Sequence, residues 1–273
     1  MTSPARDAGG VVRIDDAADP RLAPYLAVRE RDLVGRQGEF IAEGEVVLRV
    51  LLNRAPRQVR SLLVAENRLG RTEALLIEAG ERPPIYVASQ QVMDAVVGFH
   101  IHRGMLAHGA RPIDRGAGAL LDSLGERALV VGLVGIANHD NMGGLFRNAA
   151  AFGVGAVLLD AGCCDPLYRK AIRVSVGATL AVPFARLKPG EDMVAALGVA
   201  GFEALALSPG GDVALGDVRR SGRTAVLFGA EGPGLTADVL SRTRTVSIRM
   251  AAGWDSLNVA AAAAVVLHHL ATQ

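Results

Sequence analysis

The sequence has little cysteine, and it has no apolar run long enough to cross a membrane. Its 273 residues include two cysteines, Cys163 and Cys164, and these are adjacent. Adjacent cysteines provide neither a framework of structural disulfides nor the spaced pair of a metal site. The most apolar tract, Val259 to Leu267, is about half as long as a membrane span. The first ten residues show no secretory pattern, so we expect a cytoplasmic protein without a membrane partner.

The sequence also has no excess of charge of one sign. Lysine and arginine together number 29 against 28 acidic residues, which gives a formal net charge of +1. A polyanionic partner would therefore be steered only weakly by the global field and must be recognised at a local site. Half of the residues are hydrophobic and 21% are charged, a composition typical of a folded protein. The length suits two ordinary domains.

The first part of the chain alternates between helical and extended patterns. Residues 1–10 are small and polar, and we expect them to be disordered. Residues 11–110 form the first predicted domain, a small α/β unit with a largely parallel sheet. Its first predicted helix, 44–52, places Val46, Val47, Val50 and Leu51 on one face. The other expected elements are a strand at 59–65, a helix at 72–79, a strand at 85–88 and a helix that Ser89 caps and that contains Val92 to Val97.

A second α/β pattern follows a segment rich in proline, glycine and charge. We place an interdomain linker at 111–125 and the second domain at 126–273. The tract 128–134 is continuously apolar, which is typical of a strand buried on both faces. The other predicted strands are 156–160, 203–207, 224–228 and 245–250, and the predicted helices are 144–152 and 256–271.

Three loops that contain glycine follow strands in this second domain. The loops run from Asn138 to Gly153, from Leu227 to Leu235 and from Ile248 to Val259. Ligands of open α/β sheets bind beyond the carboxyl ends of the strands, so the three loops are candidates for one shared pocket. Ser256 is a natural cap for the last helix because its hydroxyl can accept from a backbone amide of the first turn.

The three loops together resemble the three signature motifs of the SpoU–TrmH family of the SPOUT class of RNA ribose methyltransferases. The resemblance covers Val130 to His268 in the correct order, and Arg173 to Ala178 fits between the first and second motifs. The tracts GEFIAEGEVVLRVLL and GMLAHG resemble a ribosomal-protein-like substrate-binding domain. The resemblance implies a trefoil-knotted C-terminal domain and a smaller α/β N-terminal domain. It also implies a homodimer that uses S-adenosyl-L-methionine to methylate a ribose 2′-hydroxyl of RNA, with ribosomal RNA favoured over transfer RNA.

The resemblance also assigns site residues, and it implies no metal site. The residues that would bind the cofactor, largely through backbone groups, are Leu227, Gly229, Gly234, Ile248, Met250 and Leu257. The residues that would form the catalytic site are Asn141, Arg147, Glu231, Ser256 and Asn258. Asn141 and Arg147 would meet the target nucleotide. The pKa of an arginine is above roughly 12, which makes it a poor general base, so we interpret Arg147 as a clamp on a phosphate or hydroxyl. The sequence does not identify the residue that acts as the general base.

Each of these assignments has a structural alternative. Asn141 could bond its own backbone, Arg147 could be a solvated helix charge, and Asn258 could only stabilise the last helix. Glu231 could be a surface turn residue, and Trp254 could either cover the pocket or pack beside it. Three positions depart from the commoner family pattern without removing a proposed catalytic group: Asn148 in place of threonine, Arg249 in place of proline and Ala260 in place of serine.

Several basic residues and histidines outside the three motifs have candidate roles. Lys170 and Arg173 could contact phosphate or form a solvated face. His100, His102 and His108 lack a ligand partner at metal spacing, and we interpret them as structural or weakly RNA-facing.

A dinucleotide-binding protein is disfavoured because the full GxGxxG pattern is missing. The rival hypotheses are a non-catalytic RNA-binding module of the same fold and the same chemistry on transfer RNA.

Overall fold

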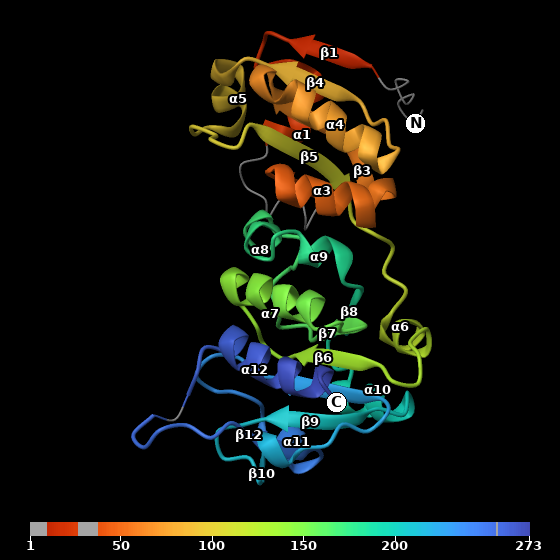
Figure 1. Cartoon of the computed structure of the whole chain (residues 1–273), viewed down its shortest axis with the longest axis vertical. Helices are drawn as coiled ribbons and strands as arrows, with labels where there is room; N and C mark the ends of the chain where they lie inside the picture. Colours follow the sequence, from red (N-terminus) through yellow and green to blue (C-terminus); the bar gives the residue numbers. More distant parts are fainter. Residues whose placement is uncertain (1–9, 27–37, 255) are drawn as a thin grey trace. The chain divides into compact units, whose positions relative to one another are not determined.

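The computed structural model describes residues 10–26, 38–254 and 256–273, so most of the predicted disordered start lies outside the described residues. The chain divides into two compact units, and Figure 1 labels their helices and strands. The first unit comprises the described residues up to Pro112 together with Leu167–Ala181. The second unit comprises Ile113–Pro166 and Val182–Gln273. The boundary near residue 112 lies inside the predicted linker, whereas Leu167–Ala181 falls in the part of the sequence given to the second predicted domain.

The first unit contains a mixed five-stranded sheet in the order β1-β4-β3-β5-β2. The strands are β1 (Val11–Ile14), β2 (Glu39–Glu43), β3 (Val59–Ala65), β4 (Ile85–Ala88) and β5 (Met105–Ala110). Strands β1, β4 and β3 are parallel, whereas β5 is antiparallel to both β3 and β2. Four of the five strands therefore run in the same direction, and the expectation of a largely parallel sheet is wrong only for β5 and its two pairings. Strands β2 and β5 were not predicted from the sequence, because the glutamates of β2 and Gly109 of β5 weaken the strand pattern.

The helices of the first unit are α1 (Ala23–Leu26), α3 (Glu45–Arg54), α4 (Leu69–Ala79), α5 (Gln90–Val97), α8 (Arg169–Val174) and α9 (Ala178–Ala181). As predicted, Ser89 caps α5 by accepting from the Val92 amide at 3.3 Å. Helix α3 exists as predicted, but its buried face consists of Val47, Leu48, Leu51 and Leu52. Val46 is 56% exposed, so the predicted face is wrong at that position.

The second unit contains a fully parallel seven-stranded sheet in the order β10-β12-β9-β11-β6-β7-β8. The strands are β6 (Leu129–Leu133), β7 (Ala156–Leu159), β8 (Phe184–Arg186), β9 (Glu203–Leu207), β10 (Val213–Ala214), β11 (Thr224–Phe228) and β12 (Arg244–Ser247). All residues of the adjacent strands β6 and β11 are buried, which explains their continuous apolar sequences. Strand β12 ends at Ser247, so the prediction that it extends to Met250 is wrong.

Five helices surround this sheet: α6 (Ala117–Asp122), α7 (His139–Ala151), α10 (Met193–Val199), α11 (Ala237–Ser241) and α12 (Val259–Ala271). Helices α7 and α12 lie side by side (Figure 1). A Cβ atom at Gly144 would stand 2.8 Å from the Cβ of Ala260, so the two helices approach closely at these small residues. The prediction that Ser256 caps α12 is wrong, since the helix begins after Asn258.

The mixed α/β architecture agrees with the predicted fold class, while the deep trefoil knot stays an expectation from the family resemblance. Among the described residues, no helix is both long and apolar enough to span a bilayer.

Candidate active site

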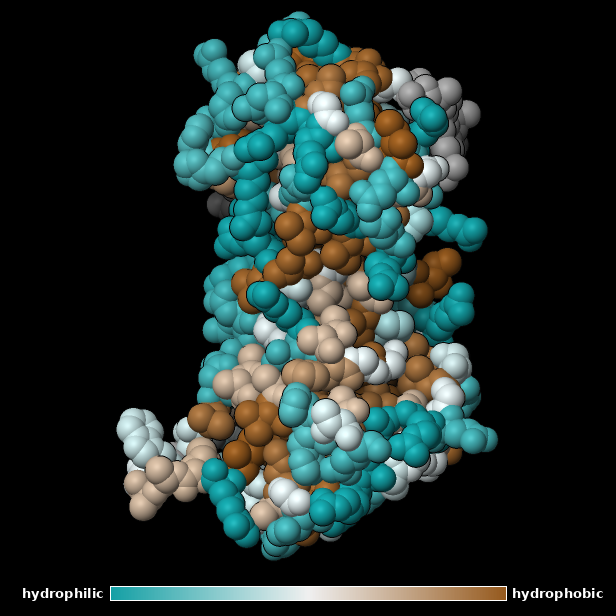
Figure 2. Space-filling model, in the orientation of Figure 1, coloured by the Kyte–Doolittle hydropathy of each residue, from teal (hydrophilic) through white to brown (hydrophobic). Residues whose placement is uncertain are grey.

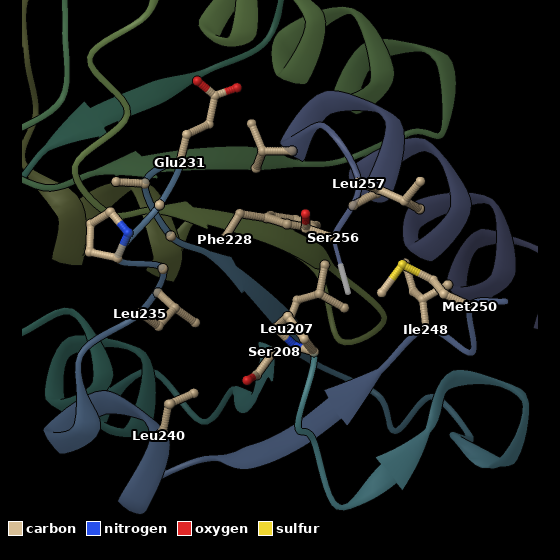
Figure 3. A pocket seen from close by; sticks show the side chains of 18 residues that line it. Leu207, Ser208, Phe228, Glu231, Leu235, Leu240, Ile248, Met250, Ser256 and Leu257 are labelled. Atoms are coloured by element: carbon tan, nitrogen blue, oxygen red, sulfur yellow. The ribbon is translucent and has the colours of Figure 1, made fainter. Parts of the chain in front are cut away.

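Two of the three predicted loops, Leu227–Leu235 and Ile248–Val259, line one cavity in the second unit, as Figure 3 shows. Among the described residues, the first loop adds none to the wall and contacts its edge through Asn141, which bonds to Glu231. The cavity has a volume of about 290 Å³ and lies where β9, β11 and β12 end. This location agrees with the general position of ligand sites in open α/β sheets. Its walls come from Leu207–Pro209, Phe228–Leu235, Leu240, Ile248 and Met250, and from Ser256, Leu257, Val259 and Ala262 around the start of α12.

Beside this cavity, Asn141, Glu231 and Asn258 form a hydrogen-bonded cluster that joins the three loops. Asn141 donates from Nδ2 to Glu231 Oε1 at 2.5 Å. Asn258 donates from Nδ2 to Asn141 Oδ1 at 2.9 Å and approaches Glu231 Oε1 at 3.4 Å. Figure 3 shows the Glu231 carboxylate pointing away from the apolar residues Leu207 and Leu240. The cluster therefore places one carboxylate and two amides at a side of an otherwise largely apolar cavity.

Two helix N-termini position the asparagines of this cluster. Asn138 caps α7, and its Oδ1 accepts from the amides of Asp140 at 2.7 Å and Asn141 at 3.3 Å. Asn258 caps α12, and its Oδ1 accepts from the amides of Ala260 at 2.9 Å and Ala261 at 3.3 Å. Asn258 thus uses its oxygen for the helix and its amide nitrogen for the cluster. The structural and functional interpretations of Asn258 are compatible, because separate atoms make the two sets of bonds.

The glycine-containing loop after β11 folds back tightly on itself. The amide of Gly234 donates to the carbonyl of Ala230 at 2.9 Å. A Cβ atom at Gly229 would lie 2.2 Å from the carbonyl carbon of Gly234. This distance is too short for any side chain to be accommodated there. Only glycine fits at residue 229 without moving the loop. The fold-back exposes backbone groups to the cavity, which are suited to contact the polar edge of a ligand.

The structure places most of the predicted cofactor residues in the cavity wall. Gly229, Gly234, Ile248, Met250 and Leu257 all line it, as do the predicted catalytic residues Glu231 and Ser256. Leu227 does not: it is buried in the core, and a Cβ atom at Gly132 would stand 2.3 Å from its Cδ2. Successive side chains of a strand point to opposite faces, so Leu227 points into the core while Phe228 lines the cavity.

The part of the cavity wall that follows β9 was not predicted from the sequence. Leu207, Ser208 and Pro209 line the cavity, yet they belong to none of the three motifs. The usable signal was the predicted strand at 203–207 followed by Ser-Pro-Gly-Gly, since a turn at a carboxyl strand end faces the ligand in this class of sheet.

Three side chains singled out from the sequence lie outside the cavity wall. Arg147 is exposed on α7, and within the described part of the chain it forms no hydrogen bond or ion pair. Arg249 is also exposed, so its charge does not enter the cavity between Ile248 and Met250. Trp254 is 76% exposed and neither covers the cavity nor packs into the core. It lies on the connection between β12 and α12, which projects from the sheet at the lower left of Figure 1.

The site combines features that suit a nucleoside-type ligand with a charged group. Leu207, Leu235, Leu240 and Ile248 can enclose a flat apolar body, whereas the folded-back glycine loop supplies backbone donors and acceptors. Glu231 supplies a negative charge at the edge. Among the described residues, no group of three or more metal-ligating side chains occurs.

Comparisons with known proteins agree with this geometry. Residues 128–268 match the model of the SpoU rRNA Methylase family. A protein of Mycobacterium tuberculosis (strain ATCC 25618 / H37Rv), named an uncharacterized tRNA/rRNA methyltransferase, is 39% identical over 93% of this chain and 89% of its own length. The chain is similar in structure to the SpoU methyltransferase AviRb of Streptomyces viridochromogenes in complex with AdoMet. The TM-score is 0.77 and the identity 26%, over 93% of this chain and 98% of that one. A crystal structure described as an RNA 2′-O ribose methyltransferase shares the fold, with a TM-score of 0.74 and 24% identity over 94% of this chain and 97% of its own.

Proposed function

Because the chain belongs to the SpoU rRNA methylase family, we propose that it transfers the methyl group of S-adenosyl-L-methionine to a ribose 2′-hydroxyl of structured RNA. The observation that carries the proposal is the cluster of Asn141, Glu231 and Asn258 beside the cavity of the second unit. It unites the three motifs on which the resemblance rests. Ribosomal RNA is the favoured substrate, since the first unit is a sizeable addition to the methyltransferase domain.

The cavity would hold the methyl donor. Gly229 and Leu257 would contact it through backbone groups, and Ile248 and Leu235 would enclose its apolar faces. When bound, the donor supplies a methyl group already activated by a positively charged sulfur. A nearby carboxylate favours a bound cation, so Glu231 would stabilise it electrostatically. The structurally similar AviRb forms a complex with the cofactor AdoMet, which supports a methyl donor of this kind.

The residues of the chain would mainly position the reactants. The ribose 2′-oxygen would accept the methyl group that the bound donor supplies. The hydroxyl proton must also leave. Asn141 and Asn258 would orient the nucleotide, and Ser256 would complete the site. Arg147, which is exposed on the same helix as Asn141, would bind a phosphate or the hydroxyl and lower the proton affinity of the ribose oxygen.

We also propose a homodimer that pairs through the face of α12. Figure 2 shows apolar residues on the surface over this helix, on which Val265 is 46% exposed. Exposed apolar side chains that lie together on one helix favour association. Light scattering at micromolar concentration should give twice the mass of the chain, and a monomer would contradict this part of the proposal.

The decisive experiment is mass spectrometry of ribosomal and transfer RNA from a strain that lacks this gene. We expect one 2′-O-methylated ribose to disappear from ribosomal RNA and to return when the wild-type chain is supplied. Loss of a transfer RNA mark would change the substrate, and loss of a base methylation would contradict the ribose specificity. Calorimetry with S-adenosylmethionine addresses the non-catalytic alternative, because a pure RNA-binding module would show no binding.

A further inference from the structure

A second pocket lies wholly within the first unit and is lined by basic side chains. It has a volume of about 360 Å³ and is formed by the start of α3, by the segment before β5 and by the end of α8. Its charged lining residues are Arg68, Arg103, Arg173, Glu45 and, when protonated, His102. The pocket belongs to none of the three motifs that build the candidate active site.

The cations of this pocket outnumber its acids. Arg68, Arg103 and Arg173 are exposed, and within the described residues none of them donates to a carboxylate. Glu45 is already engaged: its Oε1 accepts from Arg71 Nε at 2.9 Å and from Arg49 Nη2 at 3.1 Å. These bonds, above all that from Arg71, lower the pKa of Glu45 and keep it ionised. The pocket therefore presents three guanidinium groups against one carboxylate that Arg49 and Arg71 already engage, in a protein whose net charge is only +1.

The start of helix α3 adds to the positive potential. Among the described residues no side chain caps this helix, and its N-cap is Gly44, with a φ of 94°. A Cβ atom at Gly44 would lie 2.8 Å from Cδ of Arg103, so the arginine side chain lies directly across the helix end. Backbone amides at a helix N-terminus attract anions, and here they lie next to a guanidinium group.

The structure holds two of the basic segments in fixed positions. Asp94 accepts from His100 Nδ1 at 2.7 Å and from the Ile101 amide at 3.0 Å, which fixes the segment that carries His102 and Arg103. On the opposite side, the chain turns after Arg173 through Val176, whose φ is 56°. A β-branched residue rarely adopts a positive φ, so surrounding contacts must maintain this turn.

Aromatic rings lie close to the basic residues along the same segment. Phe99 is 39% exposed, and the guanidinium carbon of Arg169 lies 5.1 Å from its ring centroid. The rings of His100 and His102 meet edge to face, with centroids 4.6 Å apart. Exposed rings beside cations are the combination with which proteins bind unpaired nucleotides, by stacking on bases and pairing with phosphates.

We propose that this pocket binds a backbone phosphodiester of the RNA substrate, with the neighbouring base resting against the segment Phe99 to His102. The inference rests on the proposed function for the identity of the RNA. Arginine suits the role because its planar fork pairs with two phosphate oxygens at once. The pocket supplies the local recognition that an almost neutral chain requires.

The test compares two triple variants of the full chain. The first is Arg68→Gln with Arg103→Gln and Arg173→Gln. The matched control is Arg54→Gln with Arg57→Gln and Arg82→Gln, which removes the same charge from exposed positions outside the pocket. The probe is deproteinised bacterial ribosomal RNA, fragmented and fluorescently labelled. Its Kd is measured from 50 to 300 mM salt, and methyl transfer to unlabelled RNA is followed in parallel.

We expect the pocket variant to bind RNA at least about tenfold more weakly than wild type. Each lost phosphate contact reduces the steepness of log K against log salt by about 0.7 on single-stranded RNA, so the loss of one phosphodiester contact should reduce it by about that amount. The KM for RNA should rise while kcat and the Kd for S-adenosylmethionine stay unchanged. The control should match wild type.

Three results would overturn the proposal. The first is an unchanged Kd and salt slope in the pocket variant, and the second is an equal loss in the control variant. The third is displacement of RNA by submillimolar inorganic phosphate at constant ionic strength, which would show a site for small anions. Failure of the proposed function looks different: wild type would then methylate no RNA, while the binding comparison would still decide the role of the pocket.

Discussion

Asn258 donates a hydrogen bond of 2.9 Å to Asn141, a residue 117 positions earlier in the chain. Asn258 is the N-cap of α12, and Asn141 lies in the first turn of α7, so the bond links two helix N-termini. Glu231 accepts from both amide groups and adds the third motif to the same cluster. The cluster gives the predicted meeting of the three motifs a definite geometry, and the following experiments test it.

Replacement of Asn141 by alanine should break the cluster at its centre. Glu231 and Asn258 would each lose a hydrogen-bond partner, and because both residues are exposed to solvent this should cost only about 1 kcal/mol of stability or less. We expect kcat for methyl transfer to fall on the order of a hundredfold, the typical loss for a removed polar group that acts in a transition state. Single-turnover kinetics measures this effect, and an exposed Asn53→Ala variant is the control. Unchanged kcat in Asn141→Ala would contradict a catalytic role for the cluster.

Arg147 is exposed on α7 and outside the cavity wall, so its loss should leave binding of the methyl donor intact. We expect Arg147→Ala to bind S-adenosylmethionine with nearly wild-type affinity in calorimetry but to show no turnover. Arg147→Lys keeps the charge and loses the planar fork, so partial activity in that variant would indicate a purely electrostatic role. An active Arg147→Ala enzyme would refute the assigned role.

A methyl group at residue 229 should disturb the glycine loop. The new Cβ would stand 2.2 Å from backbone of Gly234, and a backbone neighbour cannot yield without moving the loop. We expect Gly229→Ala to weaken binding of S-adenosylmethionine at least about tenfold and to lower stability by about 1–3 kcal/mol. Gly198→Ala in α10 is the matched control, because that Cβ meets no atom within 4 Å. Equal affinity for S-adenosylmethionine in both variants would contradict a role of this loop in binding the donor.

The two cysteines should be poorly reactive in the folded protein. Burial raises the pKa of Cys163 to about 12 and that of Cys164 to about 11. Since the thiolate is the nucleophile, iodoacetamide at pH 8 should modify both residues on the order of a hundredfold more slowly than in denaturant. Mass spectrometry of the peptide that contains them gives the rates. Equal rates in folded and unfolded protein would contradict the burial.

The same shifts predict how stability depends on pH. The unfolded thiols lose their protons near an ordinary pKa of about 9, whereas the folded thiols keep theirs to higher pH. The free energy of unfolding should therefore fall as the pH rises above about 9. A Cys163→Ser and Cys164→Ser variant should show a smaller decrease in denaturant titrations over this range.

Patterns that depend on near neighbours in sequence were predictable. The continuous apolar tracts of β6 and β11 and the cap of α5 by Ser89 follow from propensity and periodicity over a few residues. The second and third motif loops line one pocket as predicted, because each follows a parallel strand and such loops emerge at one edge of the sheet. The first loop adds no residue to that wall among the described residues and meets the other two through Asn141.

Other features depended on contacts between distant segments, which local patterns do not contain. Ser256 and Asn258 are both good caps, and the choice of Asn258 goes with its hydrogen bond to Asn141. Likewise, Leu227 and Phe228 are both apolar, and the register of β11 in the sheet decides which of them faces the cavity. The sequence by itself determined which segments carry the site and most of their secondary structure. Tertiary structure decided which atoms meet, because hydrogen bonds and close packing depend on ångström-scale distances between residues far apart in the chain.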